Sequence, residues 1–154
     1  MEIIEFRPCH LDAVLKIQKA AYKPLYEKYR DGETNPYLES RETVLQKYTK
    51  AGTRGYIFTV DDVPVGTVRV DFSAGGKGAR ISALAIHPRY QGRGIAQEAL
   101  LKIEAIHSHI ERWQLGTILQ EAGNCHLYEK LDYWKTGEVK RINEKMSLVF
   151  YEKP

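Results

Sequence analysis

Residues 87–101 read HPRYQGRGIAQEALL, and this stretch decides the fold. Its glycines, Gly92 and Gly94, separate a strand-like apolar run (81–88) from a run with the apolar spacing of a helix (95–106). Glycine lets a backbone turn tightly or approach a ligand closely. The N–H groups of a first helical turn lack intrahelical partners, and with the helix dipole they favour an anion. The stretch predicts either a plain tight turn or a phosphate-binding turn to which Arg93 adds positive charge.

Two other kinds of phosphate-binding loop do not fit the spacing. A Walker A loop needs G-x-x-x-x-G-K-[ST], which occurs nowhere in the chain. A Rossmann fingerprint needs a third glycine where Gln97 stands, and repeated strand–helix units that the sequence lacks. The glycine-rich run 75–79 precedes no helix, so we expect a hairpin turn there.

Composition places the chain among soluble globular proteins. The 154 residues suffice for one domain with a real core, which we expect to span 1–154. Hydrophobic residues make up 43% and charged residues 28%, and the net charge of +3 is too dispersed to favour nucleic acid. No apolar run approaches the ~20 residues of a membrane span, and no signal peptide is apparent. Cys9 and Cys125 suggest neither disulfides nor zinc, which favours a reducing, cytoplasmic location.

The apolar periodicities predict alternating strands and helices without an internal repeat or a linker. Pro24 is expected in the first turn of a short second helix, and Asp61–Asp62 in a hairpin. The other expected elements are strands at 2–7, 80–88, 115–121, 133–139 and 145–153, and helices at 9–22, 41–49, 95–106 and 124–131. This order predicts a mixed α/β (α+β) chain built on a single central mixed β-sheet of about seven strands flanked by helices.

Residues 91–96, QGRGIA, match the Q/R-x-x-G-x-G/A signature of the GNAT superfamily of acetyl-CoA-dependent N-acetyltransferases. Downstream, 127–134, LYEKLDYW, resembles the second signature of that superfamily, in which a short helix presents a tyrosine. The order of elements is also similar, so the resemblance covers essentially the whole chain. It implies a GNAT-like acyl-CoA N-acyltransferase fold and transfer of an acetyl group from acetyl-CoA to a primary amine.

The resemblance also implies roles for individual residues. Backbone amides of the glycine turn would hold the coenzyme A pyrophosphate, and the strand before it would pair with the pantetheine arm. Tyr128 falls at the position of the general acid that protonates the leaving thiolate; the alternative is a tyrosine that only packs on the core. The implied cofactor-binding residues are Leu84, Ala85, Ile86, Gln91, Gly92, Arg93, Gly94, Ile95, Ala96 and Asn124.

Three residues depart from the family pattern. Asp132 stands where a glycine usually ends the second-signature helix, so an aspartate must hold a left-handed turn. Arg80 occupies the strand position at which some members keep a glutamate as general base. Glu121 replaces an asparagine found in many members seven residues before the tyrosine. The base therefore stays open between Glu121 and a chain of water molecules.

The segment 22–37 is expected to wall the acceptor cleft, because the family places its first helices there. It is rich in tyrosine, and polar residues lie among the tyrosines: Tyr22, Tyr26, Tyr29, Tyr37, Asp31, Glu33 and Asn35. Three tyrosines at i, i+4 and i+7 predict either core packing or an aromatic, mildly acidic pocket for a cationic amine. The candidate acceptor-binding residues are Tyr26, Tyr29 and Glu121.

The histidines show no metal-ligand pattern. His107 and His109 are two residues apart and fall on different helix faces, and His87 stands alone. We expect all three to be solvated and expect no metal site.

Two further functions remain open beside acetyl transfer. One is a non-catalytic module that binds or senses acyl-CoA, and the other is a nucleotide-binding α/β domain, which the missing loop spacings disfavour. The amine could be a small molecule or a peptide. The oligomeric state is also open, with a homodimer among the alternatives.

Overall fold

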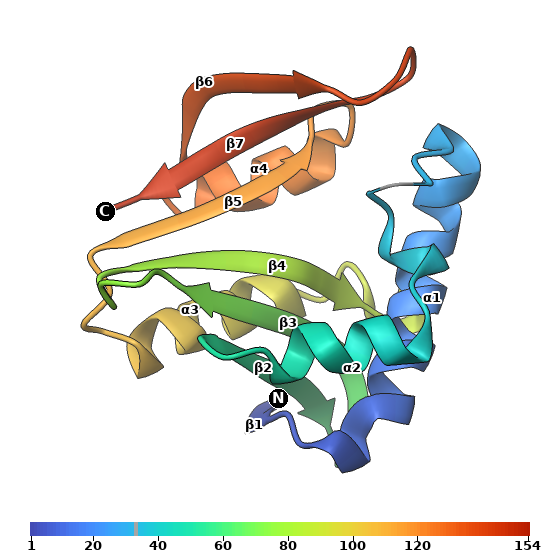
Figure 1. Ribbon diagram of the computed structural model, residues 1–154, viewed down its shortest axis with the longest axis vertical. Helices are drawn as coiled ribbons and strands as arrows, with labels where there is room; N and C mark the ends of the chain where they lie inside the picture. The colour runs from blue at the N-terminus through green and yellow to red at the C-terminus, as the bar shows by residue number, and fades with distance from the viewer. Residues whose placement is uncertain (33) are drawn as a thin grey trace.

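The computed structural model describes residues 1–32 and 34–154. Glu33, one of the acids expected beside the acceptor, lies outside the described residues. Seven strands form one mixed sheet in the order β1-β2-β3-β4-β5-β7-β6, with helices on both faces (Figure 1). The elements are β1 Glu2–Glu5, α1 Leu11–Tyr29, α2 Arg41–Thr49, β2 Thr53–Val60, β3 Val63–Phe72, β4 Gly78–Ile86, α3 Ile95–Ile106, β5 Arg112–Ile118, α4 Ala122–Lys130, β6 Trp134–Arg141 and β7 Ser147–Lys153. The predicted fold class is confirmed.

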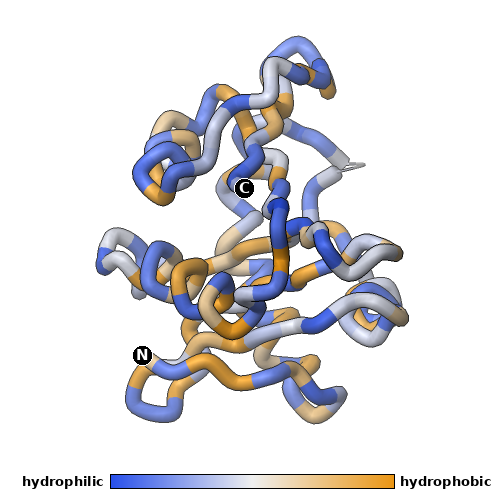
Figure 2. The backbone as a smooth tube through the Cα atoms, turned by 90° about the vertical axis from the view of Figure 1, so that its left-hand side faces the viewer, coloured by the Kyte–Doolittle hydropathy of each residue, from blue (hydrophilic) through white to orange (hydrophobic). Residues whose placement is uncertain are grey.

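The two faces of the sheet are covered by different helices. Along β2, Tyr56 and Phe58 join a core with α3 and α4, whereas Ile57 between them joins a second core with α1 and α2. This alternation follows from the two-residue period of a strand, and a strand buried on both faces reads as a continuous apolar run. Figure 2 shows hydrophobic stretches through the middle of the molecule and hydrophilic residues in most of its outer loops.

The β2–β3 hairpin is tight and left-handed at its tip. Asp61 and Asp62 have φ values of 50° and 62°, which aspartate tolerates better than most residues. Two successive residues with positive φ match the twist of the flanking strands. The predicted hairpin is confirmed, and so is the left-handed turn at Asp132, whose φ is 69°.

The sheet opens between β4 and β5. These parallel strands pair only at their beginnings, through Gly78, Ala79 and Arg80 of β4. Beyond that point β5 continues along β7, and Figure 1 shows β4 and β5 diverging toward α1. The register of β4 against β3 shifts where Ala83 adopts a φ of 51°, which marks a bulge. The bulge and the parting of the strands together shape the middle of the molecule.

Helix α1 does not break at Pro24, so the expectation of a second helix beginning there is wrong. The helix runs through the proline to Tyr29 and is capped by Arg30, which has a φ of 54°. A proline inside a helix removes one hydrogen bond and costs about 3 kcal/mol. Contacts on both sides of the proline hold the helix together: the Tyr22 hydroxyl donates to the Leu84 carbonyl, and Tyr29 is buried. Tertiary packing therefore outweighs the local preference to end the helix.

His107 is buried, which corrects the expectation of a solvated side chain. It is 5% exposed, hydrogen-bonds through Nε2 to the Tyr56 hydroxyl and packs edge-on against Phe72. It is the residue after the last turn of α3, where the backbone leaves helical geometry and turns back toward the sheet. His109 remains exposed, as expected.

The burial of His107 makes stability depend on pH. Burial, with nearby Arg54 and His109, lowers the pKa of His107, and Glu5 opposes this only weakly. The folded protein thus holds the neutral ring, while the unfolded chain takes up a proton near the ordinary histidine pKa of about 6.5. Stability should fall as the pH drops through that value. The melting temperature should therefore decrease less between about pH 7.5 and about pH 5.5 in His107→Gln than in the wild type.

The exposed His109 supplies the control for this measurement. His109→Gln should keep the wild-type dependence of melting temperature on pH, apart from a small loss of charge repulsion. If the melting temperatures of the wild type and of His107→Gln fall equally steeply with pH, the buried ring does not cause the loss of stability in acid.

Candidate active site

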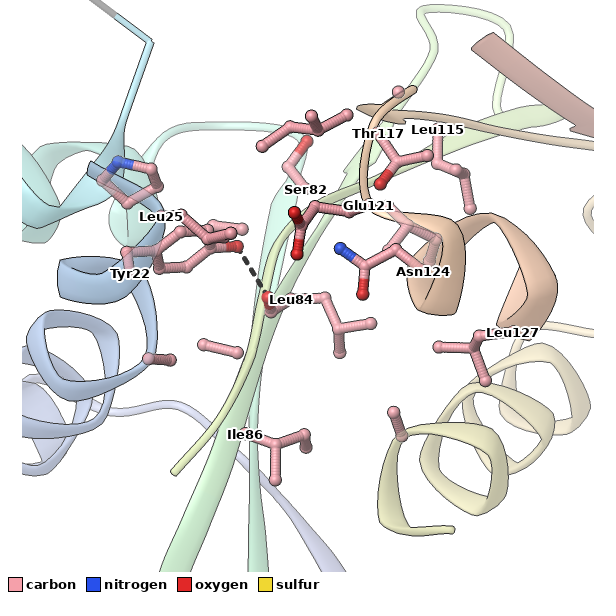
Figure 3. A pocket seen from close by; sticks show the side chains of 18 of the residues that line it. Tyr22, Leu25, Ser82, Leu84, Ile86, Leu115, Thr117, Glu121, Asn124 and Leu127 are labelled. Atoms are coloured by element: carbon pink, nitrogen blue, oxygen red, sulfur yellow. Dashed lines mark hydrogen bonds between the residues drawn. The ribbon is translucent and has the colours of Figure 1, made fainter. Parts of the chain in front are cut away.

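A cleft of about 840 Å³ lies where β4 and β5 part. Leu84 and Ile86 of β4 form one side of it, and Asn124 and Leu127 of α4 lie across from them (Figure 3). Tyr22 and other α1 residues form a further wall. The cleft reaches the glycine turn that begins α3, so the sequence motif and the split in the sheet belong to one site.

The β4 edge presents backbone groups to the cleft. Ala85 pairs with Thr67 of β3, and in an antiparallel ladder the residues on either side point their backbone groups the other way. Leu84 and Ile86 therefore face the space that β5 has left. Their carbonyls accept hydrogen bonds from side chains: Leu84 from the Tyr22 hydroxyl at 2.6 Å, and Ile86 from Gln91 Nε2 at 2.9 Å. An extended ligand one strand wide could continue the sheet here.

The glycine turn has the geometry of an anion site. Gly92 and Gly94 both have a φ of 76°, and a Cβ added to either would meet nothing within 4 Å. Gly94 is the N-cap of α3 and provides no side chain to satisfy the first-turn N–H groups. Those donors stay available to a ligand, and the helix dipole adds positive potential. Arg93 lies outside the cleft lining, with its guanidinium over the Tyr90 ring at 5.1 Å.

The sequence left open whether Tyr128 of α4 packs on the core or faces the site, and the structure shows that it does both. Its ring packs against Tyr133 and Tyr151, with centroids 6.1 and 6.0 Å away, and the residue is 7% exposed. Tyr128 also lines the cleft, and no hydrogen bond of its hydroxyl is found among the described residues. Burial raises the pKa of Tyr128, so the phenol keeps its proton at neutral pH. The cleft that contains the β4 edge thus also contains a neutral hydroxyl donor.

Glu121 stands at the start of α4 and is tied to α1. Its Oε2 accepts from Lys28 Nζ at 2.9 Å and from the Tyr29 hydroxyl at 2.5 Å. Burial raises the pKa of Glu121, but the hydrogen bonds from Lys28 and Tyr29 outweigh it, so the pKa is lowered. A carboxyl with a lowered pKa is a poor proton acceptor. Glu121 is thus better suited to stay anionic and bind than to act as a base.

The tyrosines of α1 do not act as one surface. Tyr22 lines the cleft, whereas Tyr29 is 3% exposed and reaches the site only through its bond to Glu121. Tyr26 packs against Tyr37 with centroids 5.6 Å apart and is not part of the lining. The contact between Tyr22 and Leu84 was missed by sequence reasoning, because helical spacing does not tell which tyrosine meets β4.

The described residues contain no group of three or more histidines, cysteines, aspartates or glutamates that could hold a metal ion. No helix within 1–32 and 34–154 has the length and apolar character needed to cross a bilayer.

Comparison with known structures supports the fold. A ribosomal-protein-alanine N-acetyltransferase from Escherichia coli superposes with a TM-score of 0.82 at 15% identity, covering 99% of this chain and 92% of that one. A putative acetyltransferase from Salmonella typhimurium, solved with its cofactor acetyl-CoA, gives 0.75 at 15% identity, covering 99% and 92%. A spermidine N-acetyltransferase from Vibrio cholerae, in complex with CoA and spermine, gives 0.78 at 15% identity, covering 99% and 94%.

Comparison with sequence families identifies the chain more directly. No curated protein sequence gives a significant match. The model of the acetyltransferase (GNAT) family matches residues 22–133, which include most of the cleft-lining part of α1, the β4 edge, the glycine turn and Tyr128. The chain therefore belongs to the GNAT family of acetyl-CoA-dependent N-acetyltransferases.

Proposed function

We propose that residues 1–154 act as a single N-acetyltransferase domain that transfers the acetyl group of acetyl-CoA directly to a primary amine. The observation that carries this proposal is the parting of β4 and β5, which gathers a strand edge, the glycine turn at the start of α3 and a neutral tyrosine around one cleft. A direct transfer suits this arrangement, because donor and acceptor can enter the same cleft from its two ends.

Coenzyme A fits the cleft from the glycine turn inward. The backbone amides of 92–96 would hold the pyrophosphate, as first-turn N–H groups do for phosphates elsewhere. The pantetheine arm would then run along Leu84 and Ile86, with Asn124 on the opposite wall. The similar fold of the Salmonella protein, which was solved with acetyl-CoA, supports this placement.

The chemistry then follows from the groups around the thioester. The neutral amine attacks the carbonyl carbon, and the negative charge that develops on oxygen is stabilised by backbone N–H groups of the β4 edge. As the intermediate collapses, the C–S bond breaks and Tyr128 gives its proton to the departing thiolate. The raised pKa of Tyr128 keeps that proton in place until the thiolate forms. Water can return a proton to the phenolate afterwards.

The proton of the amine passes to water in this proposal. The guanidinium of Arg80 has donors only and cannot accept it, and Glu121 has a lowered pKa. Glu121 instead provides a negative wall that attracts the ammonium form of the acceptor. The acceptors named for two structurally similar proteins, a ribosomal-protein alanine and spermidine, are both amines, which supports an amine here without choosing one.

The pyrophosphate placement can be tested by exchanging a single glycine. Gly94→Asp puts a carboxylate and a Cβ where the phosphates would lie. Coenzyme A should raise the melting temperature of the wild type through linkage, and this rise should disappear in Gly94→Asp. The measurement is a thermal melt with and without saturating coenzyme A.

Gly76→Asp is the matched control. Gly76 lies in the β3–β4 turn with a φ of 70°, and a Cβ there also meets nothing within 4 Å. Both substitutions carry a similar cost for an L-residue at positive φ, of order 1 kcal/mol. Gly76→Asp should keep the full rise with coenzyme A. A full rise in folded Gly94→Asp would remove the pyrophosphate from this turn.

The role of Tyr128 can be tested by removing only its hydroxyl. Tyr128→Phe keeps the ring that packs against Tyr133 and Tyr151, so stability and coenzyme A binding should change little. Because general acid catalysis typically contributes ~10²–10⁴-fold, kcat should fall at least tenfold. The release of free thiol from acetyl-CoA with a panel of amines provides the measurement, and wild-type turnover itself excludes a module that only binds.

Tyr133→Phe is the control for the loss of a buried hydroxyl. Tyr133 donates to Glu104 at 2.8 Å, outside the residues that line the cleft. Its loss should lower the melting temperature and leave kcat near the wild-type value. If Tyr128→Phe also keeps the wild-type kcat, another group or water protonates the thiolate.

A further inference from the structure

Two arginines, the exposed Arg80 and the half-buried Arg69, stand on one face of the sheet at the end of the cleft where β4 and β5 still pair. Arg69 of β3 and Arg80 of β4 both line it. Arg69 pairs with Ser82, and Arg80 is two residues from Ser82 along β4, so the two arginines share a face. Diagonal neighbours of this kind lie roughly 7–8 Å apart, close enough for both side chains to serve one ligand.

Neither arginine forms an ion pair with any residue in 1–32 or 34–154. Each lies over an aromatic ring instead: Arg69 over Tyr48 at 5.9 Å, and Arg80 over Phe150 at 5.7 Å. A cation–π contact attracts a guanidinium through its positive charge and needs no acid as a partner. The two side chains are thus positioned without their donors being occupied by an acid.

The acids nearby already have partners. Asp71, which lies across from Arg80, accepts hydrogen bonds from Thr53 at 2.7 Å and Ser82 at 3.0 Å, one on each oxygen. Two other acids of the cleft are held by lysines: Glu39 by Lys47, and Glu121 by Lys28. The two guanidinium groups therefore face the single carboxylate of Asp71, whose oxygens already accept hydrogen bonds from hydroxyls, and the pair of arginines keeps one positive charge in excess.

Arg80 stands at the point where the sheet opens. It is the last residue of β4 that pairs with β5, and its side chain reaches across toward Gly116 of β5. A Cβ on Gly116 would lie 3.4 Å from Arg80 Nη2 and 2.9 Å from the Phe150 ring. Because Gly116 has no side chain, Arg80 has room to lie over the Phe150 ring.

This position is far from the cofactor phosphates. Ile86 is six residues further along β4 than Arg80, roughly 20 Å in an extended strand, and the glycine turn lies beyond Ile86. Ser82 and Thr117 lie at the end of the cleft toward the paired part of β4 and β5 (Figure 3). A ligand that meets Arg80 must therefore be the acceptor and not the pyrophosphate.

We propose that Arg80, assisted by Arg69, binds an anionic group of the acceptor, so that the substrate is an amine that also carries a carboxylate or a phosphate. The proposal rests on the proposed acetyl transfer and adds the substrate class. A guanidinium binds either anion through paired N–H donors. The anion at Arg80 anchors one end of the acceptor, while its amine extends toward the thioester beside Leu84 and Tyr128.

Calorimetric titration of the coenzyme A-saturated protein tests this without requiring turnover. The ligands are matched pairs: a panel of L-amino acids against their amides, and O-phosphoethanolamine against ethanolamine. The anionic member of at least one pair should bind about tenfold tighter or more, which is about 1.4 kcal/mol. The pair whose anionic member binds more tightly identifies the anion as a carboxylate or a phosphate.

Arg80→Gln should lower the affinity for that anionic ligand at least tenfold and leave the affinities for its uncharged partner and for coenzyme A unchanged. Arg69→Gln should act in the same direction with a smaller effect. The control is Arg54→Gln, which removes an exposed arginine of β2 outside the cleft lining and should behave as the wild type.

Equal affinities within every pair, or an Arg80→Gln protein that still prefers the anion, would overturn the proposal. Measuring the release of free thiol from acetyl-CoA in the same mixtures tests acetyl transfer independently of the anion site. Binding of the anionic ligand that depends on Arg80, without acetylation of any amine, would support the anion site and refute acetyl transfer.

Discussion

The parting of β4 and β5 is the constraint on which the rest of the molecule depends. The two strands share three residue pairs, whereas β5 and β7 share six. The bulge at Ala83 helps to turn β4 away, and its φ of 51° costs of order 1 kcal/mol or more for a residue with a side chain. The hydrogen bond from Tyr22 to the Leu84 carbonyl holds the chain just after the bulge. Helix α1 thus stabilises the strand conformation that keeps the cleft open.

Features that depend on neighbours in the sequence could be predicted. The glycine turn, the Asp61–Asp62 hairpin and the helix at 41–49 each follow from a few adjacent residues, and the structure confirms the turn, the hairpin and the helix. The order of strands and helices follows in the same way from apolar periodicity. The resemblance to the GNAT family then indicated which turn and which tyrosine to examine, although their roles stay predictions.

Features that depend on distant contacts could not be predicted. Tyr22 and Leu84 are 62 residues apart, and Tyr29 and Glu121 are 92 apart, so no local pattern reveals that they meet. The same reason explains the errors at Pro24 and His107. Local preference ends a helix at the proline and leaves a histidine after a helix in water, but packing against the sheet decides both outcomes.

The open edge of β4 has a consequence for how molecules of this protein meet one another. An unpaired strand edge on an outer surface invites the edge of another sheet and thereby aggregation. Here the edge is recessed between α1 and α4, so a folded neighbour cannot reach it, while a single extended arm can. The outer edge of the sheet at β6 is protected differently. Strand β6 is exposed along its whole length, but Gly137 interrupts its pairing and Lys135, Lys140 and Arg141 place charge on it. The sheet therefore keeps its unpaired edge at its centre, within reach of an extended arm alone, and carries charge along its β6 rim.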